Sequence, residues 1–161
     1  MQARALFLTT VILGGCAHPM ALHGEHATDQ LALAIDARLD GTAGAASVWV
    51  VNHSEDPVEV ELDAIRLRDG KGARYAPLGQ AQKFAGDEQG VRRVPLGALT
   101  IPPGAHRLVE LEFEKLPPAA SDYSLVVPTA FSLGIAGQVA LKPLRVALAP
   151  AKAEFYDPFV E

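Results

Sequence analysis

Apolar and polar residues alternate over several short stretches of the chain, which is the period of a half-buried β-strand. The alternation is clear at residues 31–36, 58–63 and 109–114. Residues 47–51 are instead apolar around Trp49, as in a strand that is buried on both faces. Together these stretches predict a domain built from strands.

Further strands are predicted at 65–68, 123–127, 131–135 and 138–148, with a weaker one at 91–99. Turn-forming residues separate them at 52–57, 69–72 and 101–104. Residues 77–90 carry Gly, Gln and charge without a clear period, so they predict a long loop. No apolar stripe of helix length with capping residues is present. Short strands punctuated by Gly and Pro predict an all-β, antiparallel β-sandwich over 31–148.

The N-terminal residues follow a different pattern. A short basic start precedes an apolar stretch at 5–13, and small residues then lead to Cys16, the only cysteine. The apolar stretch is shorter than the roughly 20 residues that cross a bilayer, and the pattern indicates a secretory signal peptide. Leu13-Gly14-Gly15-Cys16 resembles the lipobox of bacterial lipoproteins. The resemblance implies that residues 1–15 are removed and that Cys16 carries a lipid.

Lipidation also explains an unpaired cysteine in an exported chain. An ordinary secretory signal is the alternative. Ala17 stands where lipoproteins retained in the inner membrane carry Asp, so the resemblance implies an outer-membrane anchor facing the periplasm of a bacterial envelope. Few large apolar residues follow, and the lipidated Cys16 is expected to begin a flexible tether over 16–30. The predicted sandwich over 31–148 and a tail over 149–161 complete the chain.

The turns and strands after Val50 resemble an immunoglobulin-like domain of bacterial envelope lipoproteins, a family of unknown function. The resemblance rests on Asn52-His53-Ser54-Glu55-Asp56-Pro57-Val58, on the Asp69-Gly70 hairpin and on the Pro103-Gly104 turn. It implies an immunoglobulin-like antiparallel β-sandwich and no particular activity. The core cysteine pair of such domains is absent, so packing around Trp49 is expected to hold the sheets together.

Charge and motifs argue against an enzyme and against nucleic acid as a partner. The net charge is −5, and removing Arg4 with the signal makes it −5 − 1 = −6, spread along the chain. Neither a Gly-x-Ser-x-Gly motif nor a phosphate-binding loop occurs. Glu110, Glu112 and Glu114 share one strand face about 7 Å apart. Because they alternate with core residues, they indicate a solvated face rather than a catalytic pair.

The predicted tether contains the one group of side chains that suggests metal chemistry. Its members are His18, Met20, His23 and His26, with Glu25 beside them. Imidazole and thioether ligands suit Cu or Zn, although the spacing matches no standard metal site. No other cofactor is expected, and His53 and His106 are expected to be hydrogen-bonded surface residues.

Aromatic side chains in the C-terminal tail need a partner surface. Phe155, Tyr156 and Phe159 either cover one end of the domain or dock on the sheet edge or groove of another protein. The sequence therefore predicts a lipid-anchored, non-catalytic envelope domain that binds a protein partner or supports an envelope assembly. Metal handling through the His/Met tether is the alternative.

Overall fold

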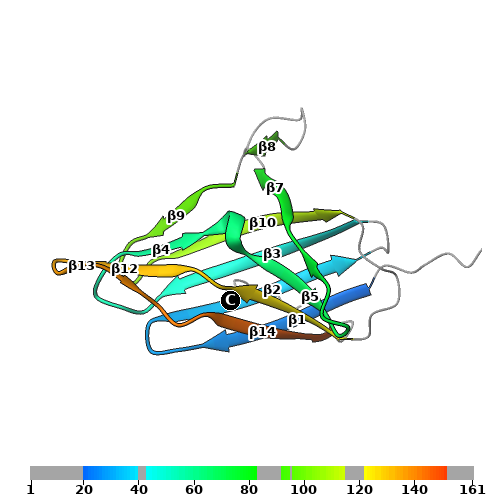
Figure 1. Ribbon diagram of the computed structural model, residues 1–161, viewed down its shortest axis with the longest axis horizontal. Helices are drawn as coiled ribbons and strands as arrows, with labels where there is room; N and C mark the ends of the chain where they lie inside the picture. Colours follow the sequence, from blue (N-terminus) through cyan, green and yellow to red (C-terminus); the bar gives the residue numbers. More distant parts are fainter. Residues whose placement is uncertain (1–19, 40–42, 83–91, 95, 115–121, 152–161) are drawn as a thin grey trace, which may run out of the picture.

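A computed structural model describes residues 20–39, 43–82, 92–94, 96–114 and 122–151 (Figure 1). The predicted signal peptide, Cys16, His18 and the aromatic residues of the tail lie outside these residues. The described chain is all-β, with fourteen strands and one short 3-10 turn. None of its described elements is a helix long and apolar enough to cross a membrane.

The elements follow one another closely along the chain. They are β1 (Met20–Ala27), β2 (Leu31–Leu39), β3 (Ala43–Asn52), β4 (Val58–Glu61), η1 (Leu62–Ala64), β5 (Arg66–Asp69), β6 (Arg74–Tyr75), β7 (Pro77–Gln82), β8 (Arg92–Val94), β9 (Ala98–Ile101), β10 (His106–Glu114), β11 (Tyr123–Val127), β12 (Ala130–Gly134), β13 (Gly137–Ala140) and β14 (Leu144–Pro150).

All strand pairs are antiparallel, and they form two sheets. The larger sheet has the order β6-β5-β11-β14-β1-β2-β3-β10-β7-β8, and the smaller one has the order β13-β12-β4-β9. The larger sheet curls like part of a barrel, so that β5 and β11 cross in front of β2 (Figure 1). Consecutive strands β4 and β5, β11 and β12, and β13 and β14 belong to different sheets. Buried side chains from both sheets form a single hydrophobic core.

The alternating stretches form strands as predicted. In β2, Leu31, Leu33 and Ile35 are buried while the residues between them are half-buried or exposed. β10 and β11 cover the predicted stretches at 109–114 and 123–127, and β5 covers 66–68 of the stretch at 65–68. β4 covers only 58–61 of the stretch predicted at 58–63, because η1 begins at Leu62. The all-β, antiparallel prediction is therefore confirmed.

Trp49 does not have the central packing role that the sequence suggested. In β3 the buried residues are Ala46, Val48, Val50 and Asn52, whereas Trp49 is half-buried on the opposite face. There it lies between Ala34 of β2 and Leu108 of β10. The prediction that this strand is buried on both faces was wrong, because only one of its faces contacts the core.

The structure differs from the predicted tether over 16–30. Met20–Ala27 forms β1, which pairs along its whole length with β2 and at one end with β14. The sequence hides this strand because Leu22 is its only large buried side chain. Gly24, in the middle of β1, packs so closely against β14 that an added Cβ would collide with the Ala147 carbonyl oxygen.

Two other boundaries differ from the predictions. The long loop expected at 77–90 begins with β7, which pairs with β10 and β8. β7 is held by backbone hydrogen bonds to these two strands, so it forms without an alternating hydrophobic pattern in its own sequence. The strand expected at 138–148 is divided into β13 and β14 around Pro143, which has no N–H for a sheet ladder.

Candidate docking hairpin

The predicted metal-ligand residues do not converge. Side chains of a strand point alternately to its two faces, so Met20 and His26 share a face of β1 and His23 lies on the other. Met20 is also partly buried against the core. Across the described part of the chain, no three His, Cys, Asp or Glu side chains are grouped to hold a metal ion. The structure thus separates three of the four predicted ligands, and the fourth, His18, lies outside the described residues.

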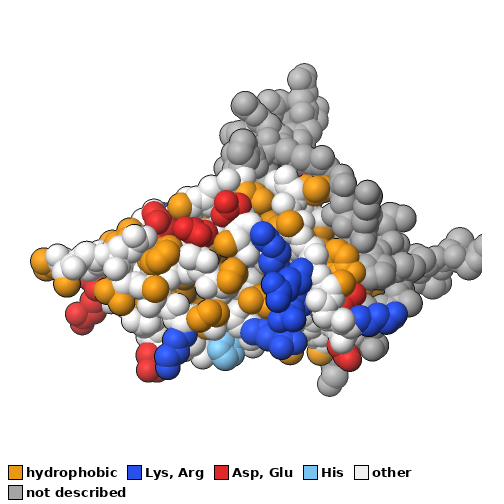
Figure 2. Space-filling view, viewed as in Figure 1, with side chains coloured by type: hydrophobic (Ala, Val, Ile, Leu, Met, Phe, Trp, Pro, Cys, Tyr) orange, Lys and Arg blue, Asp and Glu red, His pale blue; other side chains and the backbone are white. Residues whose placement is uncertain are grey.

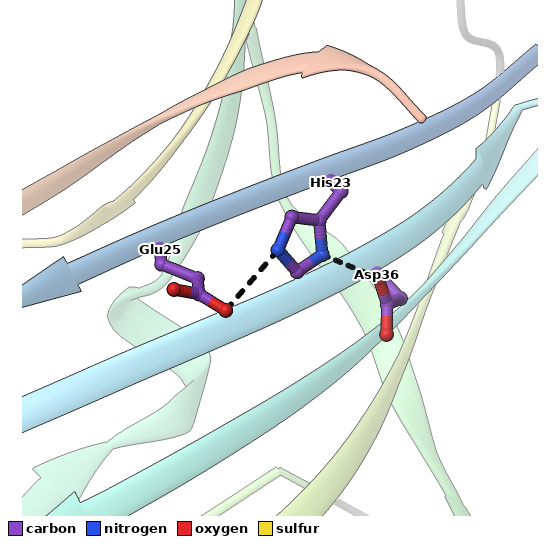
Figure 3. A network of polar contacts seen from close by, with 3 residues as sticks. All are labelled: His23, Glu25 and Asp36. Atoms are coloured by element: carbon purple, nitrogen blue, oxygen red, sulfur yellow. Dashed lines mark hydrogen bonds and ion pairs between the residues drawn. The ribbon is translucent and has the colours of Figure 1, made fainter. Parts of the chain in front are cut away.

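His23 instead joins two carboxylates on the outer face of β1 and β2 (Figure 3). Its Nδ1 lies 2.7 Å from Asp36 Oδ1, and its Nε2 lies 3.3 Å from Glu25 Oε1. The hydrogen bond with Asp36 is the main cause that raises the pKa of His23, with Glu25 adding to it. Both ring nitrogens face carboxylates, which stabilise the protonated ring. The group is a charge bridge between two strands.

The stability of the chain should depend on this bridge in a pH-dependent way. A raised folded-state pKa means that the bridge contributes fully below about pH 6.5, and that the contribution is lost as the pH rises through the raised pKa of His23. Because the three side chains are largely exposed, we expect the bridge to add less than about 1 kcal/mol to the free energy of unfolding. Urea unfolding of the native chain and His23→Gln at about pH 5.5 and about pH 8.5 measures it. A difference between the two proteins that does not shrink at the higher pH would contradict the bridge.

The clearest candidate interaction site is the hairpin of β12 and β13, residues 130–140, which we call the docking hairpin. It projects at one extremity of the molecule, at the left of Figure 1. Ile135 in its turn has a relative exposure of 109%, and Val139 of β13 has one of 56%. Monomeric proteins seldom leave large apolar side chains together in water at a protruding tip. This end of the molecule therefore has the character of a contact surface.

Val139 continues a row of side chains that is otherwise buried. In the register of the smaller sheet, Ile101, Val58, Ser132 and Val139 lie side by side across β9, β4, β12 and β13. The first three are buried, with Ile101 and Val58 at 0% exposure. Only the last position in the row is uncovered, so an additional element packed there would complete it.

β13 also presents an unpaired backbone edge. It ends the order of the smaller sheet, and no other described strand pairs with its far side. The Leu141 N–H donates to the Ala130 carbonyl, and hydrogen-bonded pairs alternate along an antiparallel ladder. The register opposite β12 therefore turns the backbone groups of Gln138 and Ala140 away from β12, toward the open edge. The N–H and C=O groups of these two residues are therefore positioned to pair with an added strand.

No charged residue, Pro or bulge within β13 discourages pairing with another strand. Natural edge strands carry charged residues, Pro or bulges that prevent association. The sequence of β13 is Gly-Gln-Val-Ala, without a charge, and all four residues are exposed. Lys142 and Pro143 follow only after the strand ends. By comparison, the edge strand β6 consists of two residues, one of which is Arg74.

The base of the docking hairpin is held by the turn after β3. The Leu133 N–H donates to the Pro57 carbonyl at 2.8 Å, and Ser132 Oγ donates to Asp56 Oδ2 at 3.4 Å. Asp56 approaches β12 so closely that a Cβ on Gly134 would lie 2.7 Å from its Oδ2. Glycine at position 134 thus permits the contact.

Asn52 organises that turn from inside the protein. Its side chain is fully buried and donates from Nδ2 to the carbonyls of Asp56, at 2.8 Å, and Ile101, at 3.0 Å. Asn52 Oδ1 accepts hydrogen bonds from the Ser54 N–H and hydroxyl, at 2.9 and 2.7 Å. The predicted turn at 52–57 is therefore present, and it fixes the docking hairpin to β3 and β9.

Sequence reasoning did not identify the docking hairpin as a site. The signal available was Gly134-Ile135-Ala136-Gly137, an apolar pair between two glycines where a hairpin turn usually carries polar residues. Gly137 adopts a positive φ of 106°, as such a turn requires. His53 and His106, expected at the surface, are both exposed. No protein-family model matches this chain, and no curated protein sequence is significantly similar to it.

Proposed function

We propose that the chain is a lipid-anchored, non-catalytic domain of the bacterial envelope that binds a protein partner by adding a strand to β13. The observation that carries the proposal is the combination of an open, uncharged edge strand with the exposed Ile135 and Val139. Strand addition uses the backbone groups of the edge for affinity and the neighbouring side chains for specificity. Burying each of these two aliphatic side chains contributes about 1.5–3 kcal/mol.

The position of the proposed anchor supports this arrangement. Cys16 precedes Met20 by four residues, a span of at most about 14 Å. Met20 pairs with Leu39 at one end of β2, whereas Leu31, at the other end of β2, pairs with Asn52. The docking hairpin is held by the turn after Asn52, so Met20 and the docking hairpin lie at opposite ends of the molecule (Figure 1). A lipid on Cys16 would leave the hairpin pointing away from the membrane, toward the periplasm.

The finer fold assignment belongs to the same proposal. We infer that the two sheets represent an immunoglobulin-like sandwich whose strands change sheet at η1 and around Pro143. The Asn52 turn and the Asp69-Gly70 hairpin, which prompted the resemblance, support it. In that hairpin Asp69 Oδ1 accepts from the Lys71 and Ala73 amides at 3.0 and 2.8 Å.

Photo-crosslinking in the intact envelope tests the proposed docking. A photoreactive amino acid at Ile135 of the full chain should give one discrete protein adduct. Placed at Lys71, in the turn between β5 and β6, the same group should not give it. Adding Val139→Lys to the Ile135 probe should remove at least about nine-tenths of the adduct, because it puts a charge where apolar burial is expected.

The control separates the anchor from the docking surface. Cys16→Ser should release the chain from the membrane fraction, whereas Val139→Lys should leave it there. If Ile135 gives no adduct, or the same adducts as Lys71, the docking proposal fails. If Cys16→Ser remains membrane-bound, the lipid anchor fails.

A further inference from the structure

A second surface of the molecule carries opposite charges on two adjoining halves. The acidic half consists of Glu59, Glu61 and Asp63, and the basic half consists of Arg66, Arg68, Arg74 and Arg145. Alternate residues in β4 and β5 are buried, so the charged residues between them point away from the core. Figure 2 shows acidic and basic groups side by side on one face. We call this surface the dipolar face.

The strand register concentrates the arginines. Arg68 lies opposite Arg74 on one side and opposite Ser124 on the other. In the next outward row, Arg66 lies opposite Val126, which lies opposite Arg145. Neighbouring strands are about 4.8 Å apart, so the positive charges in each row are about 5–10 Å apart. Like charges at this spacing repel each other unless a counter-charge approaches.

The charges of the dipolar face are not neutralised within the described chain. Arg145 Nε donates to Ser124 Oγ at 3.1 Å, and Arg66 Nη1 donates to the backbone carbonyls of Asp63 and Ile65. Within the described residues, no ion pair involves a charge of this face. The face therefore has both a donor set and an acceptor set available for intermolecular pairs.

We propose that the dipolar face binds a second copy of this chain. A two-fold axis near the Asp63–Ala64 peptide bond would turn the acidic half of one protomer onto the basic half of the other. Glu59 and Arg68 stand equally far along the chain from that bond, as do Glu61 and Arg66. The axis would thus pair Glu59 with the partner's Arg68 and Glu61 with the partner's Arg66, each pair occurring twice. Such a self-complementary contact is the usual form of a homodimer.

The composition of the face favours this partner over an anionic membrane. A membrane surface would attract the arginines but repel Glu59, Glu61 and Asp63, which point to the same side. A second copy satisfies both halves. Half-buried Phe131, opposite Glu59, and half-buried Val126, opposite Arg66, supply apolar contacts beside the charges.

Charge reversal followed by mixing tests the dimer. The full chain in mild detergent is analysed by sedimentation velocity, with Arg66→Glu/Arg68→Glu as one variant and Glu59→Arg/Glu61→Arg as the other. The native chain should form a dimer, and each variant alone should dissociate at least about tenfold more readily. A one-to-one mixture of the two variants should dimerise again. Restored pairing also shows that both variants are folded.

The controls separate this surface from the docking hairpin and from lipid binding. Arg107→Glu/Lys142→Glu changes the net charge equally away from the face and should leave the dimer intact, as should Val139→Lys. A monomeric native chain, or a mixture of variants that stays monomeric, overturns the proposal. A further outcome is a native chain that is a monomer, binds phosphatidylglycerol vesicles and loses this binding with Arg66→Glu/Arg68→Glu. That result would assign the face to an anionic membrane and would also overturn the dimer proposal.

Discussion

Replacing Phe113 by alanine should lower the free energy of unfolding by about 3–5 kcal/mol. Phe113 is among the largest fully buried side chains, with 1% exposure, and it lies in β10 between β3 and β7. Its removal leaves a cavity at the place where these central strands contact the rest of the core. Trp49→Ala should cost roughly half as much, because the indole is half-buried on the outer face.

Urea unfolding of both variants gives the comparison. The ratio of the two decreases in the free energy of unfolding shows which side chain contributes more to the core, whatever the stability of the native chain. A Trp49→Ala loss larger than that of Phe113→Ala would restore the packing role that the sequence suggested for Trp49, and it would contradict the burial pattern of β3.

Asn52→Ala should lower the free energy of unfolding by about 2–4 kcal/mol. The substitution leaves the buried carbonyl of Ile101 without its side-chain donor and the Ser54 amide without its acceptor, while the Asp56 carbonyl keeps only the Ser54 hydroxyl. Each unsatisfied buried group costs about 1–3 kcal/mol. Because the same turn holds β12 through Pro57, the loss should also reduce the Ile135 crosslink.

The matched control for Asn52→Ala is Gln138→Ala, a polar-to-alanine change at an exposed position of β13. It should stay within about 0.5 kcal/mol of the native chain. If Asn52→Ala lowers the free energy of unfolding no more than Gln138→Ala does, the turn at 52–57 does not hold the docking hairpin in place.

The strands that the sequence predicted are those in which buried and exposed side chains alternate. In β2 and β10 every second residue enters the core, so the period is visible without knowledge of neighbours. β1 is different, since its sequence holds His, Gly, Glu and Ala, and its place is set by pairing with β2 and β14. Non-local hydrogen bonds of this kind leave little trace in a local pattern.

The candidate site was hidden for a related reason. Val139 and Ile135 look like ordinary core residues in the sequence, and only the sheet order shows that nothing described covers them. Likewise, the sequence grouped Met20, His23 and His26 with His18 as candidate metal ligands, and the strand places His23 on the opposite face from Met20 and His26. Both outcomes depend on which face a residue occupies, and that is fixed by tertiary structure.

Residue-resolved amide hydrogen exchange tests the proposed strand addition most directly. It compares the full chain alone with the chain bound to the protein identified by the Ile135 crosslink. The amides of Gln138 and Ala140, which point to the open edge, should exchange rapidly in the free chain and become protected in the complex. The Val139 amide, which faces β12, should change little. Protection that appears elsewhere, with Gln138 and Ala140 still exchanging freely, would contradict docking on β13.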